Sequence, residues 1–184
     1  MIIYLMSFEI FYKLRRGEEN GRVDLFTLQF YVIRMVNDTD IGALLASTEI
    51  LVHPEDYMLV SVSREEESKA REILGKTDAF SSITFDYAEV SLVLKAEEWD
   101  ELKGGFREYK VEGPYRLITF DIVLDLSIVG FLAVVSARLA EAGVSIYALS
   151  TFLRDHILVK GEDADVAEKV LAGLIEDSKR LQEL

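Results

Sequence analysis

The 184-residue chain contains no cysteine and only two histidines, His53 and His156. Without cysteine it has neither a disulfide framework nor a thiolate metal site. Two histidines offer little for a metal cluster or a histidine-based catalytic triad. Basic residues are also scarce, 20 against 33 acidic ones, and the formal net charge is -13. Because such a charge repels the phosphates of nucleic acids, we expect no nucleic-acid partner.

The sequence also has little that resembles a membrane or targeting segment. The apolar stretch 117–135 contains Asp121 and Asp125, and a membrane span of about 20 residues would not carry both at low cost. The apolar residues 1–6 form a short run that basic residues follow instead of preceding, which is the wrong order for a signal peptide. We therefore read 117–135 as a strand and a buried helix, and expect a cytoplasmic protein without membrane contact.

Two segments of the chain repeat one short pattern, in which an apolar strand ends in Thr-Phe and a carboxylate opens the next strand. The copies are Ser82-Ile83-Thr84-Phe85 with Glu89-Val90-Ser91-Leu92-Val93, and Leu149-Ser150-Thr151-Phe152 with Asp155-His156-Ile157-Leu158-Val159. An internal repeat indicates two copies of one supersecondary unit. The two turns, each with an acid, could then face each other across a pseudo-twofold axis.

Hydrophobic periodicity predicts the same order of elements in both halves. In the second half it predicts a strand, a helix, two strands and a helix, at 115–124, 130–142, 145–151, 156–160 and 163–177. In the first half it predicts strands at 57–62, 80–85, 89–94 and 106–111 and helices at 65–74 and 97–102, with Gly113-Pro114 as the boundary. This order is the ferredoxin-like split βαβ pattern.

The second copy lacks a final strand of its own. We expect Glu49–Val52, just before Pro54, to cross over and complete it. The predicted fold is therefore α+β, with two ferredoxin-like (βαββαβ) units that have antiparallel sheets and helices on one face. The units would span 48–114 and 115–184, after an N-terminal extension at 1–47. Residues 1–34 are either an extra element docked on the core or lie upstream of a true start at Met35.

The second copy resembles a known family in the run from Gly130-Phe131 through Ala140-Glu141-Ala142-Gly143 to Thr151-Phe152, and in Asp155-His156-Ile157-Leu158-Val159. It looks like the ACT domain, in particular that of tandem ACT proteins such as the cytosolic arginine sensors of the CASTOR type. It is also similar to the regulatory tail of aspartate kinases. The first half carries a weaker copy in 89–93 and 111–114, and the resemblance covers 48–173.

The resemblance implies that a free amino acid binds at the interface between two ACT units, at the loop before the first helix of a unit. A helix N-terminus offers unpaired N–H groups to a carboxylate, and Gly130 lets the backbone approach closely. Asp155 would receive the ammonium group. The candidate ligand-binding residues are Ser127, Ile128, Val129, Gly130, Phe131, Thr151, Phe152 and Asp155, with Glu89 and Ser91 in the first copy.

Each candidate also has a purely structural interpretation. Gly130 could mark a tight strand-to-helix turn, Thr151 a strand residue and Asp155 an ordinary turn acid. His156 either points outward from its strand or packs in the sheet. We expect His53, which precedes Pro54, to be a turn residue. The arginine sensors carry acidic residues in the loop that here holds Ser127, Ile128 and Val129, so an apolar or small amino acid is as compatible as arginine.

Three functions remain open from the sequence. The first is a non-catalytic, ligand-sensing regulatory protein with a protein partner or a homodimer. The second is an enzyme or a subunit of a metabolic enzyme, because ferredoxin-like folds host many chemistries. The third is a structural adaptor with no small-molecule ligand. We find no catalytic constellation, no metal site and no cofactor motif, and therefore favour the first.

Overall fold

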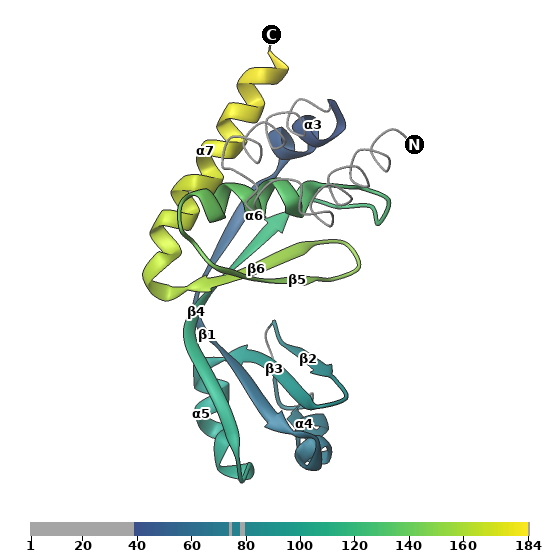
Figure 1. Cartoon of the computed structure of the whole chain (residues 1–184), viewed down its shortest axis with the longest axis vertical. Helices are drawn as coiled ribbons and strands as arrows, with labels where there is room; N and C mark the ends of the chain where they lie inside the picture. The colour runs from purple at the N-terminus through teal and green to yellow at the C-terminus, as the bar shows by residue number, and fades with distance from the viewer. Residues whose placement is uncertain (1–38, 74, 78–79, 184) are drawn as a thin grey trace, which may run out of the picture.

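The computed structural model describes residues 39–73, 75–77 and 80–183. Within these, all strand pairs are antiparallel and form one sheet of order β2-β3-β1-β4-β6-β5 (Figure 1). The strands are β1 (Glu49–Ser63), β2 (Ser82–Phe85), β3 (Glu89–Lys95), β4 (Tyr109–Asp121), β5 (Ile146–Ser150) and β6 (Asp155–Lys160). The α-helices are α3 (Thr39–Ser47), α4 (Glu67–Ile73), α5 (Ala96–Leu102), α6 (Phe131–Glu141) and α7 (Ala164–Gln182), with short 3₁₀ turns η1 (Arg64–Glu66), η2 (Lys103–Gly105) and η3 (Gly161–Asp163).

The sheet contains two ferredoxin-like units that share its two longest strands. The first unit runs β1-α4-β2-β3-α5-β4, and the second runs β4-α6-β5-β6-α7. The N-terminal part of β1 completes the second unit, since Glu49 pairs with Asp121 and Val52 pairs with Ile118. The predicted crossover of Glu49–Val52 is thereby confirmed, and two continuous strands connect the units.

The predicted boundary at Gly113-Pro114 lies inside β4, and the strand continues through it. At this point the pairing with β1 shifts register, from Tyr57 opposite Tyr115 to Leu59 opposite Glu112. Gly113 has a φ of 147°, and a Cβ added there would lie 2.9 Å from the carbonyl oxygen of Tyr57. A bulge tolerates proline, which lacks an N–H for the ladder. The glycine and proline therefore bend the strand between the units without ending it.

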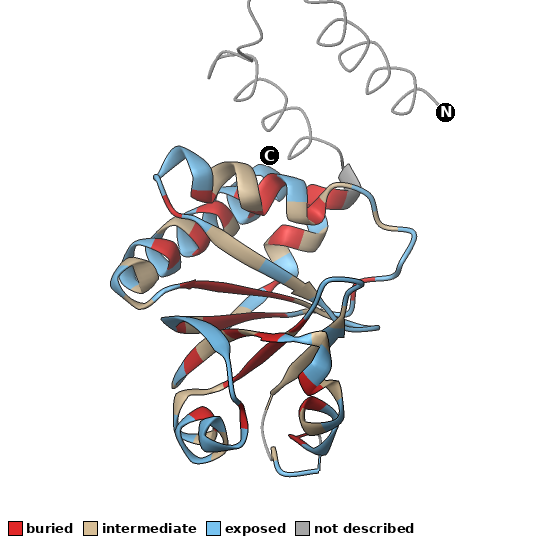
Figure 2. Ribbon diagram, turned by 60° about the horizontal axis from the view of Figure 1, so that its bottom comes forward, coloured by how far each residue is buried: buried red, intermediate tan, exposed pale blue. Residues whose placement is uncertain are grey.

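Each unit buries its own helices against one face of its part of the sheet, as Figure 2 shows. In the second unit α3, α6 and α7 cover a core that includes Ile118, Phe120 and Ile157. In the first unit α4 and α5 cover a core around Val60, Leu92 and Trp99. A third core has no helical residue and joins the sheet faces of both units; its buried members are Tyr57, Val93, Tyr115, Leu117 and Leu158.

Helix α3 belongs to the stretch that we assigned to an extension, and it packs into the second unit. Its residues Ile41 and Leu45 are 5% and 1% exposed and lie in the core with α7. The two interpretations of residues 1–34 concern a segment outside the described residues. For 39–47, the burial shows that this helix is part of the folded unit.

The two histidines meet at Thr119 in the middle of the molecule. Thr119 Oγ1 lies 2.9 Å from His53 Nε2 and 2.9 Å from His156 Nδ1. We expected His53 to occupy a turn, and this is wrong, because β1 continues through Pro54. His156 is buried, and the ring of Phe80 lies 4.7 Å away between ring centroids. The histidines are therefore part of the packing between strands.

Candidate functional site

A hollow of about 260 Å³ lies at one end of the second unit, where the loop between β4 and α6 meets the turn between β5 and β6. Two hydrogen-bonded contacts hold the loop to the turn. Leu124 donates its N–H to the carbonyl of Leu153 at 2.9 Å, and Arg154 Nε donates to Asp121 Oδ1 at 2.9 Å. The lining residues are Leu124, Asp125, Leu126, Ile128, Gly130, Phe131, Leu132, Ala133, Ser150, Thr151, Phe152, Arg154 and Asp155.

Asp125 shapes the loop above the hollow. Its Oδ1 accepts the N–H of Ser127 at 2.8 Å, and its carbonyl accepts the N–H of Ile128 at 2.9 Å. Hydrogen bonds from the Ser127 side chain and backbone hold the pKa of the Asp125 carboxyl below its ordinary value, although burial acts in the opposite direction. Asp125 thus forms an Asx turn, and its carboxylate stabilises the conformation of the loop.

The N-terminus of α6 forms one side of the hollow. Gly130 precedes it with a φ of 105°, and no side chain caps the helix. The carbonyl of Gly130 accepts the first helical hydrogen bond, from the N–H of Val134 at 3.0 Å. The N–H groups of the first helical turn have no partner within a helix, and Phe131, Leu132 and Ala133 line the hollow. This side therefore suits an anionic group, such as a carboxylate.

A carboxylate stands on the side of the β5–β6 turn. Asp155 opens β6, is half-buried, and accepts a hydrogen bond from Ser150 Oγ at 2.6 Å through Oδ1. An ionised carboxylate accepts several hydrogen bonds, so Asp155 retains capacity for a cationic donor. Thr151 closes the turn itself, donating both its N–H, at 2.8 Å, and its hydroxyl, at 3.1 Å, to the carbonyl of Arg154. The hollow thus has a positive helix end and a negative side chain.

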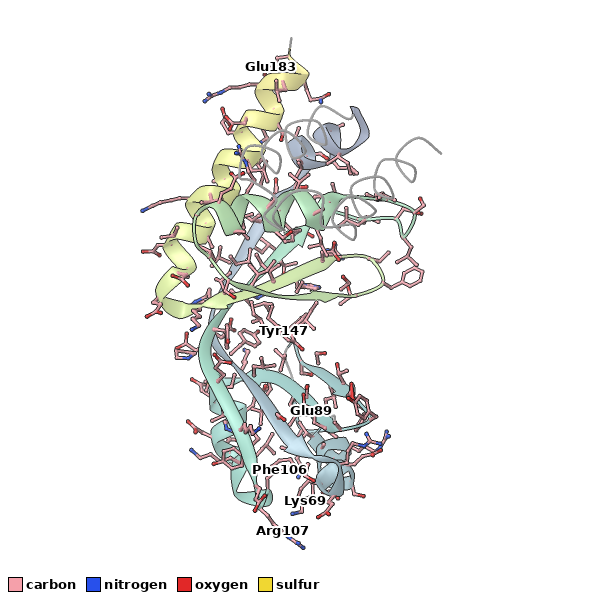
Figure 3. All side chains as sticks on the ribbon, in the orientation of Figure 1. Lys69, Glu89, Phe106, Arg107, Tyr147 and Glu183 are labelled. Carbon is pink, nitrogen blue, oxygen red and sulfur yellow. The ribbon has the colours of Figure 1, made fainter. Side chains whose placement is uncertain are left out.

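The structure brings together six of the ten predicted site residues, namely Ile128, Gly130, Phe131, Thr151, Phe152 and Asp155. Ser127 and Val129 belong to the same loop but do not line the hollow. Glu89 and Ser91 lie on β3 in the first unit, where Glu89 (labelled in Figure 3) accepts hydrogen bonds from Ser61 and Ser91. No residue of the first unit lines the hollow.

Sequence reasoning missed seven lining residues: Leu124, Asp125, Leu126, Leu132, Ala133, Ser150 and Arg154. For two of these residues, the sequence contained a pattern that could have identified them as part of the site. Asp125, two residues before a serine, is typical of an Asx turn. Ser150 precedes the Thr-Phe pair in a pattern that we used only to find the repeat. The others are positioned by how the loop folds back onto the turn.

Residues 110–173 match the ACT domain. The match covers the second unit from β4 into α7. The fold is similar to that of the regulatory subunit of aspartate kinase from Thermus flavus (TM-score 0.51, 10% identity, 68% of this chain and 95% of that chain). No curated protein sequence matches the chain.

Two further solved structures have the same fold. One is a possible transport protein of unknown function from Vibrio cholerae (TM-score 0.57, 23% identity, 74% of this chain and 96% of that chain). The other is the allosteric aspartate kinase of Clostridium acetobutylicum (TM-score 0.55, 15% identity, 68% of this chain and 34% of that chain). At these identities the likeness concerns the fold alone.

Two other kinds of site can be assessed over the described residues. Among them, no group of three or more His, Asp or Glu side chains is arranged to hold a metal ion. No helix in this part of the chain is both long and apolar enough to cross a membrane.

Proposed function

We propose that the protein is a non-catalytic regulatory protein that binds a free amino acid in the hollow of its second ACT unit. One observation carries this proposal: the uncapped N-terminus of α6 and the carboxylate of Asp155 line the same hollow. A zwitterion places a carboxylate and an ammonium group a few bonds apart. The helix N–H groups would bind the carboxylate of the ligand, and Asp155 would bind its ammonium group.

We further propose that another ACT unit covers the bound ligand, as the resemblance to tandem ACT proteins of the CASTOR type implies. Two apolar side chains that line the hollow are well exposed in the single chain, Leu126 (77%) and Phe152 (78%), and Val129 in the same loop as Leu126 is 68% exposed. Exposed apolar side chains gathered in one place indicate an interaction surface. A second copy of the chain would supply that unit, and ligand binding would change the surface offered to a regulated enzyme.

The rival function is an adaptor for a metabolic enzyme that binds no small molecule. The same exposed apolar residues favour it, because they could contact a protein partner directly. Ligand binding distinguishes the two functions. We expect at least one of the twenty amino acids to raise the melting temperature by several degrees, since about a hundredfold excess over Kd stabilises by about 2.7 kcal/mol. If none does so at millimolar concentration, the adaptor function is the better one.

Two matched variants then locate the site. Asp155→Asn keeps the shape and removes the charge, and we expect it to weaken binding by about 2–5 kcal/mol, because the ligand's ammonium group loses its charged partner. Glu89→Gln also removes one carboxylate charge, in the first repeat and away from the hollow, and should leave the affinity unchanged. Isothermal titration with the best amino acid measures both. Loss of affinity in Glu89→Gln alone would move the site to the first repeat.

A further inference from the structure

Apolar side chains line the hollow from each element around it. The large ones, on the β4–α6 loop, on α6 and on the β5–β6 turn, are Leu124, Leu126, Ile128, Phe131, Leu132 and Phe152. Leu124 and Phe131 are buried, whereas Leu126 and Phe152 are 77% and 78% exposed. The hollow therefore has buried apolar side chains within it and exposed ones on the loop and on the turn.

The charged side chains that line the hollow already have partners within the chain. Ser127 donates hydrogen bonds from its hydroxyl and its N–H to Asp125, and Arg154 Nε donates to Asp121 at 2.9 Å. Asp155 accepts from a serine hydroxyl and, under the proposed function, also binds the ammonium group of the ligand. Among the described lining residues, a charge on the ligand's side chain would therefore meet only groups that are already engaged.

The hydroxyl groups that line the hollow are engaged as well. Ser150 Oγ donates to Asp155 at 2.6 Å. Thr151 Oγ1 donates to the carbonyl of Arg154 at 3.1 Å and accepts the N–H of the same residue at 3.2 Å. A polar ligand side chain would lose hydrogen bonds to water without gaining an equivalent partner, whereas an apolar side chain gains from contact with the apolar residues.

The volume of the hollow, about 260 Å³, suits a single amino acid. Sites for drug-sized ligands usually occupy about 300–1,000 Å³. The N–H groups of α6 and the carboxylate of Asp155 would hold the ligand's main-chain groups. The side chain of the ligand would then lie against the apolar residues.

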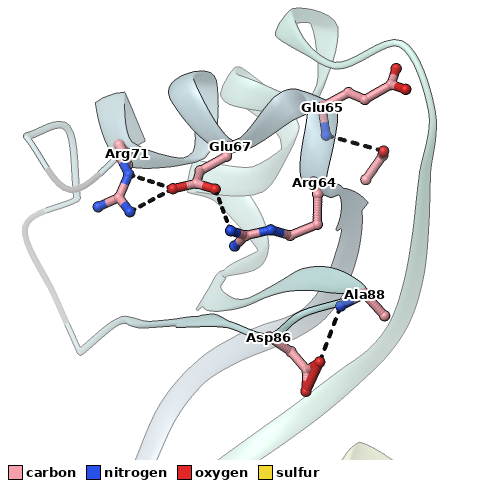
Figure 4. A network of polar contacts seen from close by, with 7 residues as sticks. Arg64, Glu65, Glu67, Arg71, Asp86 and Ala88 are labelled. Atoms are coloured by element: carbon pink, nitrogen blue, oxygen red, sulfur yellow. Dashed lines mark hydrogen bonds and ion pairs between the residues drawn. The ribbon is translucent and has the colours of Figure 1, made fainter.

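Apolar residues at this place are not a requirement of the fold, because the corresponding segment of the first repeat is charged. The counterpart of the start of α6 is η1 with the start of α4, and residues 64–67 there are Arg-Glu-Glu-Glu. Glu67 pairs with Arg64 at 2.7 Å and with Arg71 at 2.6 Å (Figure 4). The apolar start of α6 is therefore particular to the second repeat.

The turns of the two repeats correspond, and this correspondence supplies a control residue. The N–H of Asp86 donates to the carbonyl three residues further on at 3.0 Å, as the N–H of Thr151 does at 2.8 Å. Tyr87 thus occupies the place of Phe152, and it is 94% exposed. No described residue of the first unit lines the hollow.

We propose that the amino acid in the hollow has an uncharged apolar side chain, and that Leu126 and Phe152 contact this side chain from the loop and from the turn. This ligand class rests on the proposed function. Because both residues are well exposed in the single chain, they can be replaced with little effect on the fold.

Isosteric amino acids test the ligand class. Valine and threonine have nearly the same shape, and so have leucine and asparagine. In isothermal titration of the full chain, we expect the apolar member of the tighter-binding pair to bind at least about tenfold more tightly than its polar isostere. The ligand class is wrong if a polar or charged amino acid binds more tightly than both valine and leucine, although the proposed function then stands. If none of the twenty amino acids binds, both are wrong.

Leu126→Ser and Phe152→Ser test the two contacts. Each should lower the affinity ratio between valine and threonine at least threefold, because the apolar ligand loses an apolar neighbour. The melting temperature should stay within about 2 °C of wild type, since substitutions at exposed positions change stability little. An unchanged ratio in both variants would overturn the proposed contacts.

Tyr87→Ser and Val129→Ser are the matched controls. Tyr87→Ser makes the same kind of change at the corresponding place of the first repeat, and it should keep the ratio. Val129 is 68% exposed and shares the loop with Leu126, but it does not line the hollow. Val129→Ser should therefore also keep the ratio, and a loss equal to that in Leu126→Ser would show that the exposed apolar residues act without contacting the ligand.

Discussion

At the scale of single residues, the hydroxyl of Thr119 joins the two histidines of the chain. One hydroxyl donates one hydrogen bond and accepts another, so it can serve both rings at 2.9 Å when the rings present one acceptor and one donor. Nε2 of His156 is buried without a partner. Burial, followed by the nearby His53, lowers the pKa of His156, and Asp155 acts in the opposite direction. The folded protein therefore favours neutral His156.

This lowered pKa predicts a pH dependence of stability. Below the ordinary histidine pKa of about 6.5, the unfolded chain binds a proton that folded His156 does not. The free energy of unfolding should therefore fall as the pH drops from about 6.5 through the lowered pKa of His156. Urea unfolding between about pH 7.5 and pH 5 measures this slope, and most carboxylates titrate below that window.

Two histidine variants identify the source of the slope. His156→Gln removes the titrating group, so its unfolding free energy should vary less with pH than that of wild type. His53→Gln retains His156 and should keep most of the slope, because burial is the larger cause of the lowered pKa. An unchanged slope in His156→Gln would assign the effect to other groups.

At the scale of elements, helix α3 differs most from what its place in the sequence suggests. It precedes the first strand, but its side chains pack in the core of the second unit. Thr48 Oγ1 donates to the carbonyl of Leu44 at 2.7 Å at the end of the helix, just before β1 begins. The helix therefore leads directly into the strand segment that completes the second unit.

Shortening a buried side chain of α3 tests this packing. Leu45 is 1% exposed, and Leu45→Ala should destabilise the protein by about 2–5 kcal/mol, because it leaves a cavity in the core. Leu181→Ala, at a position on α7 that is 45% exposed, should change stability by less than about 0.5 kcal/mol. Thermal unfolding of both variants measures the difference, and equal melting temperatures would show that α3 does not stabilise the fold.

At the scale of the whole molecule, β1 and β4 pass through both units, and the helix-free core joins their sheet faces. Neither unit has a complete four-stranded sheet without these shared strands. We therefore expect the described part of the chain to unfold as one cooperative body. The single tryptophan of the sequence, Trp99, lies in the core of the first unit and reports on that unit.

A core substitution in the second unit should therefore shift the unfolding of the first. Leu139 on α6 is fully buried, and Leu139→Ala should lower the Trp99 fluorescence midpoint by as much as the far-ultraviolet circular dichroism midpoint. Val166→Ala, at a position on α7 that is 44% exposed, should leave both midpoints close to those of wild type. A Trp99 midpoint that stays constant in Leu139→Ala would mean that the units unfold separately.

Much of the fold could be predicted from local pattern. The helix at 130–142 is observed as α6, and Gly143 ends it with a φ of 76°. At the predicted boundary Gly113-Pro114 we expected one strand to end and another to begin. Glycine and proline mark a turn in most local contexts, but here they stand in a bulge and β4 continues through them. For the candidate site, the repeated sequence pattern indicated the β5–β6 turn, and Gly130 before α6 indicated the β4–α6 loop. Which side chains line the hollow depends on the Leu124–Leu153 and Arg154–Asp121 contacts.

The sequence by itself determined the repeated order of strands and helices, because hydrophobic periodicity and glycine positions act over a few residues. The tertiary structure decided that the predicted crossover segment and the predicted strand at 57–62 form one continuous strand, β1, and it set the register, in which Glu49 pairs with Asp121 across 72 positions of the chain. It also decided which side chains meet across elements. Arg71 is one basic residue on a helix in the sequence, and only folding places its guanidinium over the ring of Phe85.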